Sequence, residues 1–172
     1  MMFYSTPGHG GFHVSELLLA TMPEALRGPT FSGPGWYEED CDAVLVMVAF
    51  PERFTPEEVA NADASLKNGY LYDRWEKFHG RELAPGESRA KDEMHWYAEH
   101  KKDLIVTAAW GDWHEEVPSG MVGVCARPGG HTTAANRTTD RYFLVPNEEY
   151  DAKGKFGFIV DPAKHKEVGR IF

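Results

Sequence analysis

The sequence contains little cysteine and no long apolar run. Its two cysteines, Cys41 and Cys125, lie far apart, and neither belongs to a Cys-x-x-Cys motif. We therefore expect both to be reduced thiols in a cytoplasmic protein. No apolar run approaches the roughly 20 residues that a membrane-spanning helix needs, and the N-terminal residues lack the basic flank and apolar core of a signal peptide. The sequence thus predicts no association with a membrane.

Basic residues are scarce as well. The 172 residues include 18 Lys and Arg against 27 Asp and Glu, which gives a net charge of −9. The imbalance is concentrated in residues 1–60, where 2 basic residues stand against 9 acidic ones. A nucleic-acid-binding protein normally presents a basic face, because phosphate neutralisation supplies most of its affinity. We therefore expect no general nucleic-acid binding. The acidic N-terminal part suits a basic protein partner, a metal ion or solubility alone.

Common catalytic signatures are absent too. The sequence has no Gly-x-Ser-x-Gly nucleophile motif, no His-Glu-x-x-His zinc motif, no EF-hand loop and no set of kinase motifs. A serine hydrolase of the common kind is thereby disfavoured. The glycine-rich segment at 127–133 has neither the lysine of a P-loop nor the spacing of a dinucleotide-binding loop. No particular cofactor follows from the sequence.

The composition that remains is that of an ordinary globular protein. Hydrophobic residues make up 42% and aromatic residues 13%, and the length favours a single domain over residues 1–172. Extended pieces at 3–6 and 12–15 flank a glycine-rich turn, and helical periodicity follows. The β-rich runs come last, at 104–110, 121–126, 142–145 and 156–160. We predict an α+β fold with an N-terminal β element, three to four helices and a C-terminal antiparallel sheet of about four strands.

Two segments carry the clearest helical signals. Apolar residues on one face predict a buried helix over 36–50, with a buried strand as the alternative. Its first turn would contain consecutive acidic residues, which the helix dipole favours at that end. Cys41 falls on the apolar face, so we expect it to be buried. Thr55 and Glu58 form a capping-box pattern that predicts the start of the next helix.

The first candidate site joins the glycine-rich turn to this acidic segment. Glycines around His9 indicate a tight turn that needs positive φ or a close backbone approach. If the turn packs on the helix start, His9 and His13 could bind a divalent metal ion together with acidic residues. Alternatively, His9 could act as a base with Glu39 or Asp40, or for a Cys41 thiolate stabilised by the helix N-terminus. A purely structural turn beside a solvated helix start is the simplest alternative.

A second set of candidates is predicted to bind rather than to catalyse. Trp110 and Trp113 flank a turn that contains Asp112, and paired aromatic residues are common anchors in interfaces, with core packing as the alternative. His131 lies in a long polar loop at 127–141, and loops of that length are usually functional or mobile. Glu38 supplies negative charge for a basic partner.

Several segments together resemble a known family. They are STPGHGG at 5–11, WYEEDC at 36–41, AWGDW at 109–113 and YFLVP at 142–146. This set resembles an uncharacterised domain family carried by bacteriophages, plasmids and other mobile elements of proteobacteria, over nearly the whole chain. The resemblance implies translation in a bacterial cytoplasm, and it implies no established activity, cofactor or catalytic residue.

These observations lead to two functional hypotheses. The first is a small acidic mobile-element protein that binds a host protein, in the manner of a counter-defence inhibitor. The acidic N-terminal part, the aromatic content and the missing catalytic signatures favour it. The alternative is a small hydrolase that uses His9 with acidic residues or Cys41, with or without a metal ion. The histidine placed among glycines favours that alternative.

Overall fold

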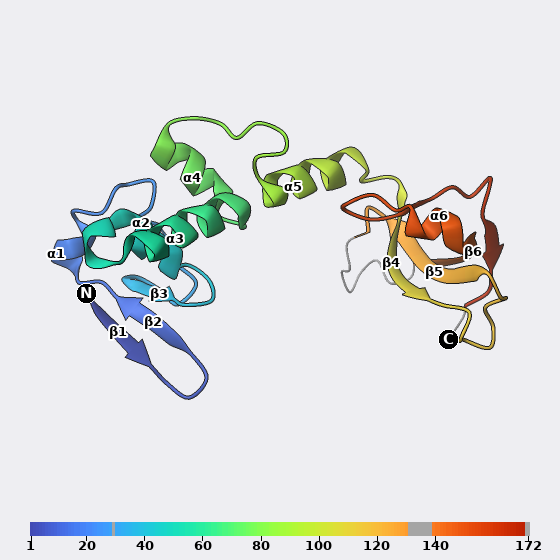
Figure 1. The fold of residues 1–172 in the computed structure, drawn as a ribbon, viewed down its shortest axis with the longest axis horizontal. Helices are drawn as coiled ribbons and strands as arrows, with labels where there is room; N and C mark the ends of the chain where they lie inside the picture. Colours follow the sequence, from blue (N-terminus) through green and yellow to red (C-terminus); the bar gives the residue numbers. More distant parts are fainter. Residues whose placement is uncertain (29, 131–138, 171–172) are drawn as a thin grey trace. The chain divides into compact units, whose positions relative to one another are not determined.

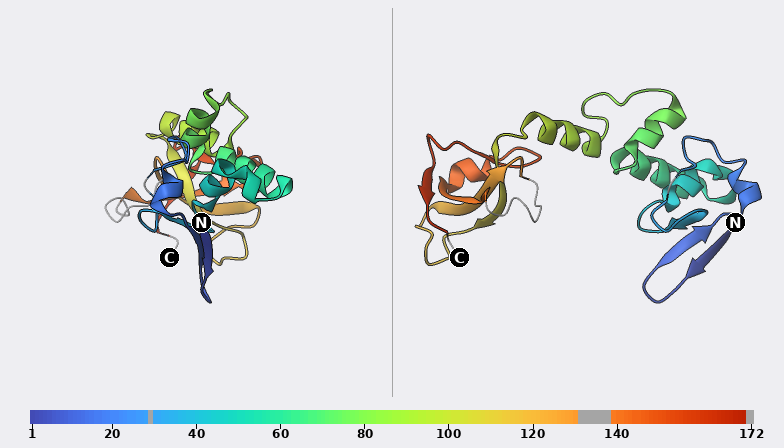
Figure 2. Two further views of the ribbon diagram at one scale, coloured as in Figure 1. Left: turned by 90° about the vertical axis from the view of Figure 1, so that its left-hand side faces the viewer. Right: turned by 180° about the vertical axis from the view of Figure 1, so that it is seen from behind.

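The computed structural model describes residues 1–28, 30–130 and 139–170. The chain divides into two compact units, Met1–Asp92 and Glu93–Phe172 (Figures 1 and 2). Each unit has a hydrophobic core of its own. The predicted α+β class is confirmed. A single domain over the full length stays a prediction.

The first unit begins with a three-stranded antiparallel sheet. Its strands are β1 (Met2–Ser5), β2 (Gly10–His13) and β3 (Trp36–Glu38), in the order β1-β2-β3. The turn between β1 and β2 is closed by the Thr6 backbone N–H, which donates to the His9 carbonyl over 2.8 Å. Figure 1 shows this hairpin projecting beyond the helices of its unit, with β1 on the outside of the sheet.

Helices form the rest of the first unit, and one of them, Ala43–Ala49, packs against β2 and β3. They are α1 (Glu16–Leu19), α2 (Ala43–Ala49), the 3₁₀ turn η1 (Pro51–Arg53), α3 (Pro56–Asn68) and α4 (Tyr72–His79). The boundary between the units lies within a further helix, α5 (Arg89–Glu99). The core of the first unit is formed by buried side chains from the sheet and helices, among them Phe12, Tyr37, Leu45, Val46, Leu66 and Trp75. No helix within the described residues is long and apolar enough to cross a membrane.

The predicted helix over 36–50 is wrong in its first half. Residues Trp36–Glu38 form β3, and the helix begins only at Ala43. The carboxylate of Asp42 accepts hydrogen bonds from the backbone N–H groups of Glu38 at 2.6 Å and Phe31 at 2.9 Å. These bonds stabilise a turn at the point where the apolar pattern would have continued the helix. The acidic residues therefore precede the helix rather than occupying its first turn.

The start of α3 is predicted correctly. Thr55 is the N-cap, its hydroxyl accepts from the Glu58 backbone N–H, and the Glu58 carboxylate accepts from the Thr55 backbone N–H. Both halves of the capping box are present, so two otherwise unpaired donors at the helix end are satisfied.

The second unit is built on a five-stranded antiparallel sheet. Its strands are β4 (Leu104–Trp110), β5 (Met121–Pro128), β6 (Arg141–Pro146), β7 (Ile159–Val160) and β8 (Lys166–Val168), in the order β7-β4-β5-β6-β8. The short helix α6 (Asn147–Asp151) lies against β5 and β6 (Figure 1). The fifth strand, β8, was not predicted, because a short edge strand with two charged residues gives no apolar signal.

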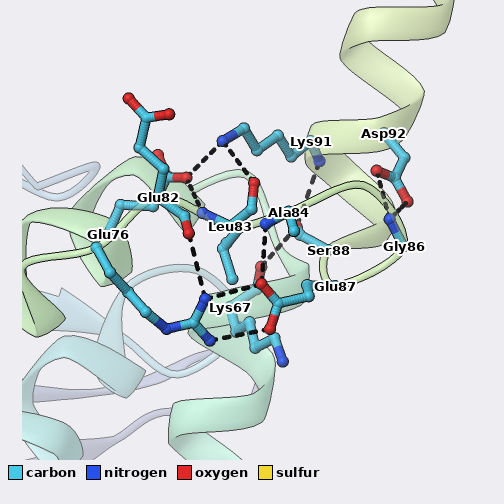
Figure 3. Close-up of polar contacts among 11 residues, drawn as sticks. Lys67, Glu76, Glu82, Leu83, Ala84, Gly86, Glu87, Ser88, Lys91 and Asp92 are labelled. Carbon is cyan, nitrogen blue, oxygen red and sulfur yellow. Dashed lines mark hydrogen bonds and ion pairs between the residues drawn. The ribbon is translucent and has the colours of Figure 1, made fainter.

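Charged side chains fix the loop between α4 and α5 in the first unit (Figure 3). The Glu87 carboxylate accepts two hydrogen bonds from the Arg81 guanidinium, at 2.7 and 2.9 Å, and one from the Ala84 backbone N–H at 2.8 Å. The Glu76 carboxylate accepts from Lys91 and from the Leu83 backbone N–H, both at 2.6 Å. The Glu87 carboxylate thus stabilises the loop internally, and the Glu76 carboxylate of α4 ties that helix to the loop and to α5.

This arrangement predicts a pH-dependent contribution from Glu87. The bonds from Arg81 and from the Ala84 backbone lower the pKa of Glu87 to about 2, from an ordinary value of 4.5. A carboxyl group whose pKa is lower in the folded chain stabilises the fold above its unfolded pKa. The contribution is lost as the pH falls toward 2. We expect Glu87→Gln to lower the midpoint of urea unfolding at pH 7, and the difference from the wild type to shrink between pH 4.5 and pH 2.

The control for this measurement is Glu82→Gln. Arg81 binds Glu82 through the backbone carbonyl rather than the carboxylate, so this variant should follow the wild-type pH profile. A Glu87→Gln difference that is the same at pH 2 and pH 7 would contradict the assignment.

Candidate functional site

The pairing of the strands in the N-terminal sheet shows which residues lie on each of its two faces. The row Phe3–Phe12–Tyr37 faces the core, since Phe12 and Tyr37 are buried there. Neighbouring residues along a strand point to opposite faces. The rows Met2–His13–Trp36 and Tyr4–Gly11–Glu38 therefore share the face away from the core. This second face is the candidate site.

Two glycines leave the middle of this sheet without side chains. Neither Gly10 nor Gly11 has a positive φ, so the predicted close approach, rather than left-handed backbone, explains them. A Cβ on Gly11 would lie 2.8 Å from the Tyr37 carbonyl oxygen of β3, and one on Gly10 would lie 2.7 Å from the Phe3 ring. The contact at Gly11 is with backbone, which cannot move aside, so β2 requires a glycine at this position. The contact at Gly10 is with the end of an exposed side chain, which can move.

A cleft of about 320 Å³ lies over this bare backbone. Its aromatic walls are Tyr4 from β1 and Trp36 from β3, whose ring centroids are 5.3 Å apart. The His13 ring packs against Trp36 at 4.7 Å. His9 and Glu38 line the cleft as well. The volume falls at the lower end of the range of ligand pockets, about 300–1,000 Å³.

Glu38 brings two of the predicted catalytic residues together. One carboxylate oxygen lies 3.0 Å from Nδ1 of His9, and the other accepts a hydrogen bond from the Cys41 thiol over 3.3 Å. The Glu38 side chain is only 15% exposed, whereas that of His9 is 73% exposed. The carboxylate therefore stands between the imidazole and the thiol, and it occupies the position that a base would need to activate Cys41.

The predicted Cys41 thiolate is not supported by this geometry. The pKa of the Cys41 thiol is raised above its ordinary value, first because its S–H donates to Glu38 and then because partial burial disfavours the charged form. The nearby carboxylates of Asp42 and Asp40 raise the pKa further. In addition, α2 begins at Ala43, so Cys41 lies before the helix, and its side chain is half-buried rather than buried.

The remaining candidates in this unit lie outside the cleft. The Glu39 side chain packs at Gly10 and Phe3, and Asp40 is exposed in the turn that follows β3. The His13 ring packs against Trp36, whereas His9 contacts Glu38. Within the described ranges, no three His, Cys, Asp or Glu side chains form a group that could hold a metal ion.

The binding candidates of the second unit lie near the end of β4. Trp113 is 77% exposed, and Trp110 is the last residue of the strand, half-buried. The Asp112 carboxylate accepts from the Gly120 backbone N–H over 3.2 Å, which stabilises the turn. His131 lies outside the described residues. An exposed tryptophan on an ordered turn is compatible with an interface anchor.

Comparison with protein families finds a match for the first part of the chain. Residues 1–101 match a family described as a domain of unknown function, DUF7007. The chain belongs to this family. The segments at 5–11 and 36–41 lie inside the matched region, whereas those at 109–113 and 142–146 lie beyond it. Membership of an uncharacterised domain family is therefore confirmed over residues 1–101 rather than over nearly the whole chain, and its occurrence in mobile elements stays a prediction. No curated protein and no solved structure matches this chain.

Sequence reasoning missed three residues of the DUF7007 site. Tyr4 and Trp36 form the walls of the cleft, and Asp42 holds Glu38 through its backbone N–H. Pairing of β3 with β2 in antiparallel register would have placed both aromatic residues on the Glu38 face. That signal was hidden, because residues 36–38 fit the apolar pattern of the helix that follows.

The close approach at Gly11 predicts a loss of stability on substitution. We expect Gly11→Ala to lower the free energy of unfolding by about 1–3 kcal/mol, since the added methyl group meets backbone that cannot rotate away. The matched control is Gly8→Ala in the same hairpin, where no atom lies within 4 Å of the added methyl group and φ is not positive. Urea unfolding measures both. Equal stabilities of the two variants would contradict the close approach.

The contact between Cys41 and Glu38 predicts that the thiol reacts slowly with alkylating reagents at neutral pH. In a Cys125→Ser background, we expect alkylation of Cys41 by iodoacetamide to reach half its maximal rate above the ordinary thiol pKa of 9.0. Glu38→Gln removes the negative charge and should move this midpoint to lower pH, whereas Glu39→Gln should leave it in place. A wild-type midpoint below the ordinary value would restore the thiolate hypothesis.

Proposed function

We propose that this DUF7007 chain binds a protein partner, which adds an extended segment to the outer edge of β1. The observation that carries the proposal is the exposure of this strand. All four residues of β1 are exposed, and its apolar side chains Met2, Phe3 and Tyr4 are 58%, 51% and 44% exposed. Apolar residues gathered on an outer strand are typical of a surface that a partner covers.

The backbone of β1 is arranged for strand addition. The Thr6 N–H bonds to His9 across the hairpin, and bonded pairs alternate along an antiparallel ladder. Phe3 and Ser5 therefore direct their N–H and C=O groups outward, where the described residues provide no further strand. Edges are commonly protected by lysine, proline or a bulge, and β1 contains neither residue and pairs in register. These features support recognition by β-strand addition.

The identity of the partner is inferred from charge and resemblance. The net charge of −7 over residues 1–60 favours a basic partner. The resemblance to mobile-element proteins makes a protein of the bacterial host, in its cytoplasm, the expected partner. We propose stoichiometric inhibition, with a host defence complex as the expected target.

A small hydrolase stays the alternative proposal. The contact between His9 and Glu38 in a cleft supports it, because an imidazole and a carboxylate within hydrogen-bond reach can exchange protons with a bound substrate. The raised pKa of Cys41 argues against a thiolate nucleophile. Under this alternative Glu38 and His9 act as base and acid, and Glu39, Asp40 and His13 have no direct part.

The role of the β1 edge can be tested by placing a proline at a residue whose backbone N–H points away from β2. Ser5→Pro removes an outward N–H donor and leaves the bonds to β2 in place, and proline is tolerated on edge strands. We expect it to weaken partner capture about tenfold, because a backbone acceptor of the partner is left without its donor. The measurement is quantitative mass spectrometry of proteins retained from proteobacterial lysate by immobilised wild-type and variant chains.

The matched control is Glu16→Pro. It places a proline at the first position of α1, after Ser15, whose backbone is extended and accepts a following proline. This variant should retain the same proteins as the wild type. If every protein retained by the wild type is retained equally by Ser5→Pro, the edge is not the binding surface. A dimer of the chain that Ser5→Pro abolishes would also overturn the proposal, in favour of pairing between two copies.

A further inference from the structure

We propose that the cleft beside β1 binds a cationic side chain, the guanidinium or ammonium group of an arginine or lysine in the partner segment. This inference rests on the proposed function and assigns a chemistry to the cleft. The charge of the side chains that line the cleft supports it. Among the described residues that form the cleft, none is lysine or arginine, and Glu38 is the one carboxylate.

The aromatic walls favour the same kind of ligand. The faces of Trp and Tyr rings attract cations through their quadrupoles, and Trp36 and Tyr4 are 38% and 44% exposed. A neutral apolar group would bury the Glu38 carboxylate without a compensating charge, which is unfavourable. An anion would meet the carboxylate directly. A cation is the ligand whose charge suits both the rings and the carboxylate.

The carboxylate is held in place before a ligand arrives. Its backbone N–H is fixed by the buried Asp42, and the Cys41 thiol donates to one of its oxygens. The other oxygen lies on the His9 side of the residue, and His9 is largely exposed and able to move aside. A positioned carboxylate loses little conformational entropy on binding, and a charge-assisted hydrogen bond to it is stronger than a neutral one.

The partner segment reaches this position from the edge of β1. A strand paired with β1 would lie about 4.8 Å from it, and a side chain opposite Tyr4 would share the face of the cleft. The floor beyond Tyr4 is Gly11, which presents no side chain as an obstacle. Arginine and lysine carry their charge on long stems that can pack along the Tyr4 ring while the head approaches Glu38.

The test uses the indole signal of Trp36 in ¹H–¹⁵N NMR spectra of the full chain. The sequence has five tryptophans, and Trp36→Phe assigns the signal. The probe is the peptide acetyl-Thr-Val-Arg-Val-Thr-amide, and the control probe replaces arginine with citrulline, which is of similar size but neutral. We expect saturable shifts of the Trp36 signal with the arginine peptide and shifts at least tenfold weaker in affinity with the citrulline peptide.

Two variants of equal charge localise the effect. Glu38→Gln should weaken binding of the arginine peptide about tenfold, whereas Glu39→Gln should not, because its side chain packs on the Phe3 side of the sheet. The other tryptophan signals report whether each variant remains folded. Equal binding of the two peptides, equal binding by the two variants, or no shift at millimolar arginine peptide would each overturn the inference.

The outcome is separable from that of the strand-addition proposal. If the arginine peptide shifts Trp36 while Ser5→Pro leaves partner capture intact, the cleft binds a cation and the edge is not the binding surface. If Ser5→Pro abolishes capture while the two peptides bind equally, the edge holds the partner and the cation assignment is wrong.

Discussion

The buried carboxylate of Asp42 is the interaction on which the N-terminal site depends. It receives hydrogen bonds from the loop at Phe31 and from the end of β3 at Glu38, and α2 begins at the following residue. A buried carboxylate is stable only where such donors satisfy it. Three segments that would otherwise be independent are therefore fixed relative to one another, and Glu38 is fixed with them. The cleft, the thiol contact and the turn between sheet and helix all follow from this one group.

Sequence reasoning succeeded where the signal was local. The capping box at Thr55, the order of helices before strands, and the tight approach at the glycines around His9 could all be predicted, because each depends on neighbouring residues. It failed at 36–42, where apolar spacing suits both a strand followed by a turn and a continuous helix. The choice is made by pairing with β2 and by Asp42, both of which are contacts distant in sequence. The candidate site stays a prediction, and within these segments the structure brings Glu38, rather than Glu39 or Asp40, into contact with both His9 and Cys41.

The binding and enzymatic hypotheses meet at the same carboxylate. Glu38 could bind a cation or exchange a proton with His9, and our proposal of binding draws on what surrounds this carboxylate. Aromatic walls, a strand edge that pairs with no further described strand, and a thiol with a raised pKa are the features on which that proposal rests. The DUF7007 match covers this entire surface, since residues 1–101 include all three strands of the N-terminal sheet and the helices of the first unit. The exposed Trp113 of the second unit lies outside the matched residues and is not part of this surface.

The bare backbone of β2 also has an evolutionary consequence. The floor of the cleft admits only glycine at position 11, because any side chain would collide with the carbonyl of Tyr37. The walls meet no backbone in this way, since the Tyr4 and Trp36 side chains are partly exposed and contact other side chains. A lineage that needs to follow a changing partner can therefore replace the walls one residue at a time, without rebuilding the sheet. The fold separates the part that must stay constant from the part that is free to diversify.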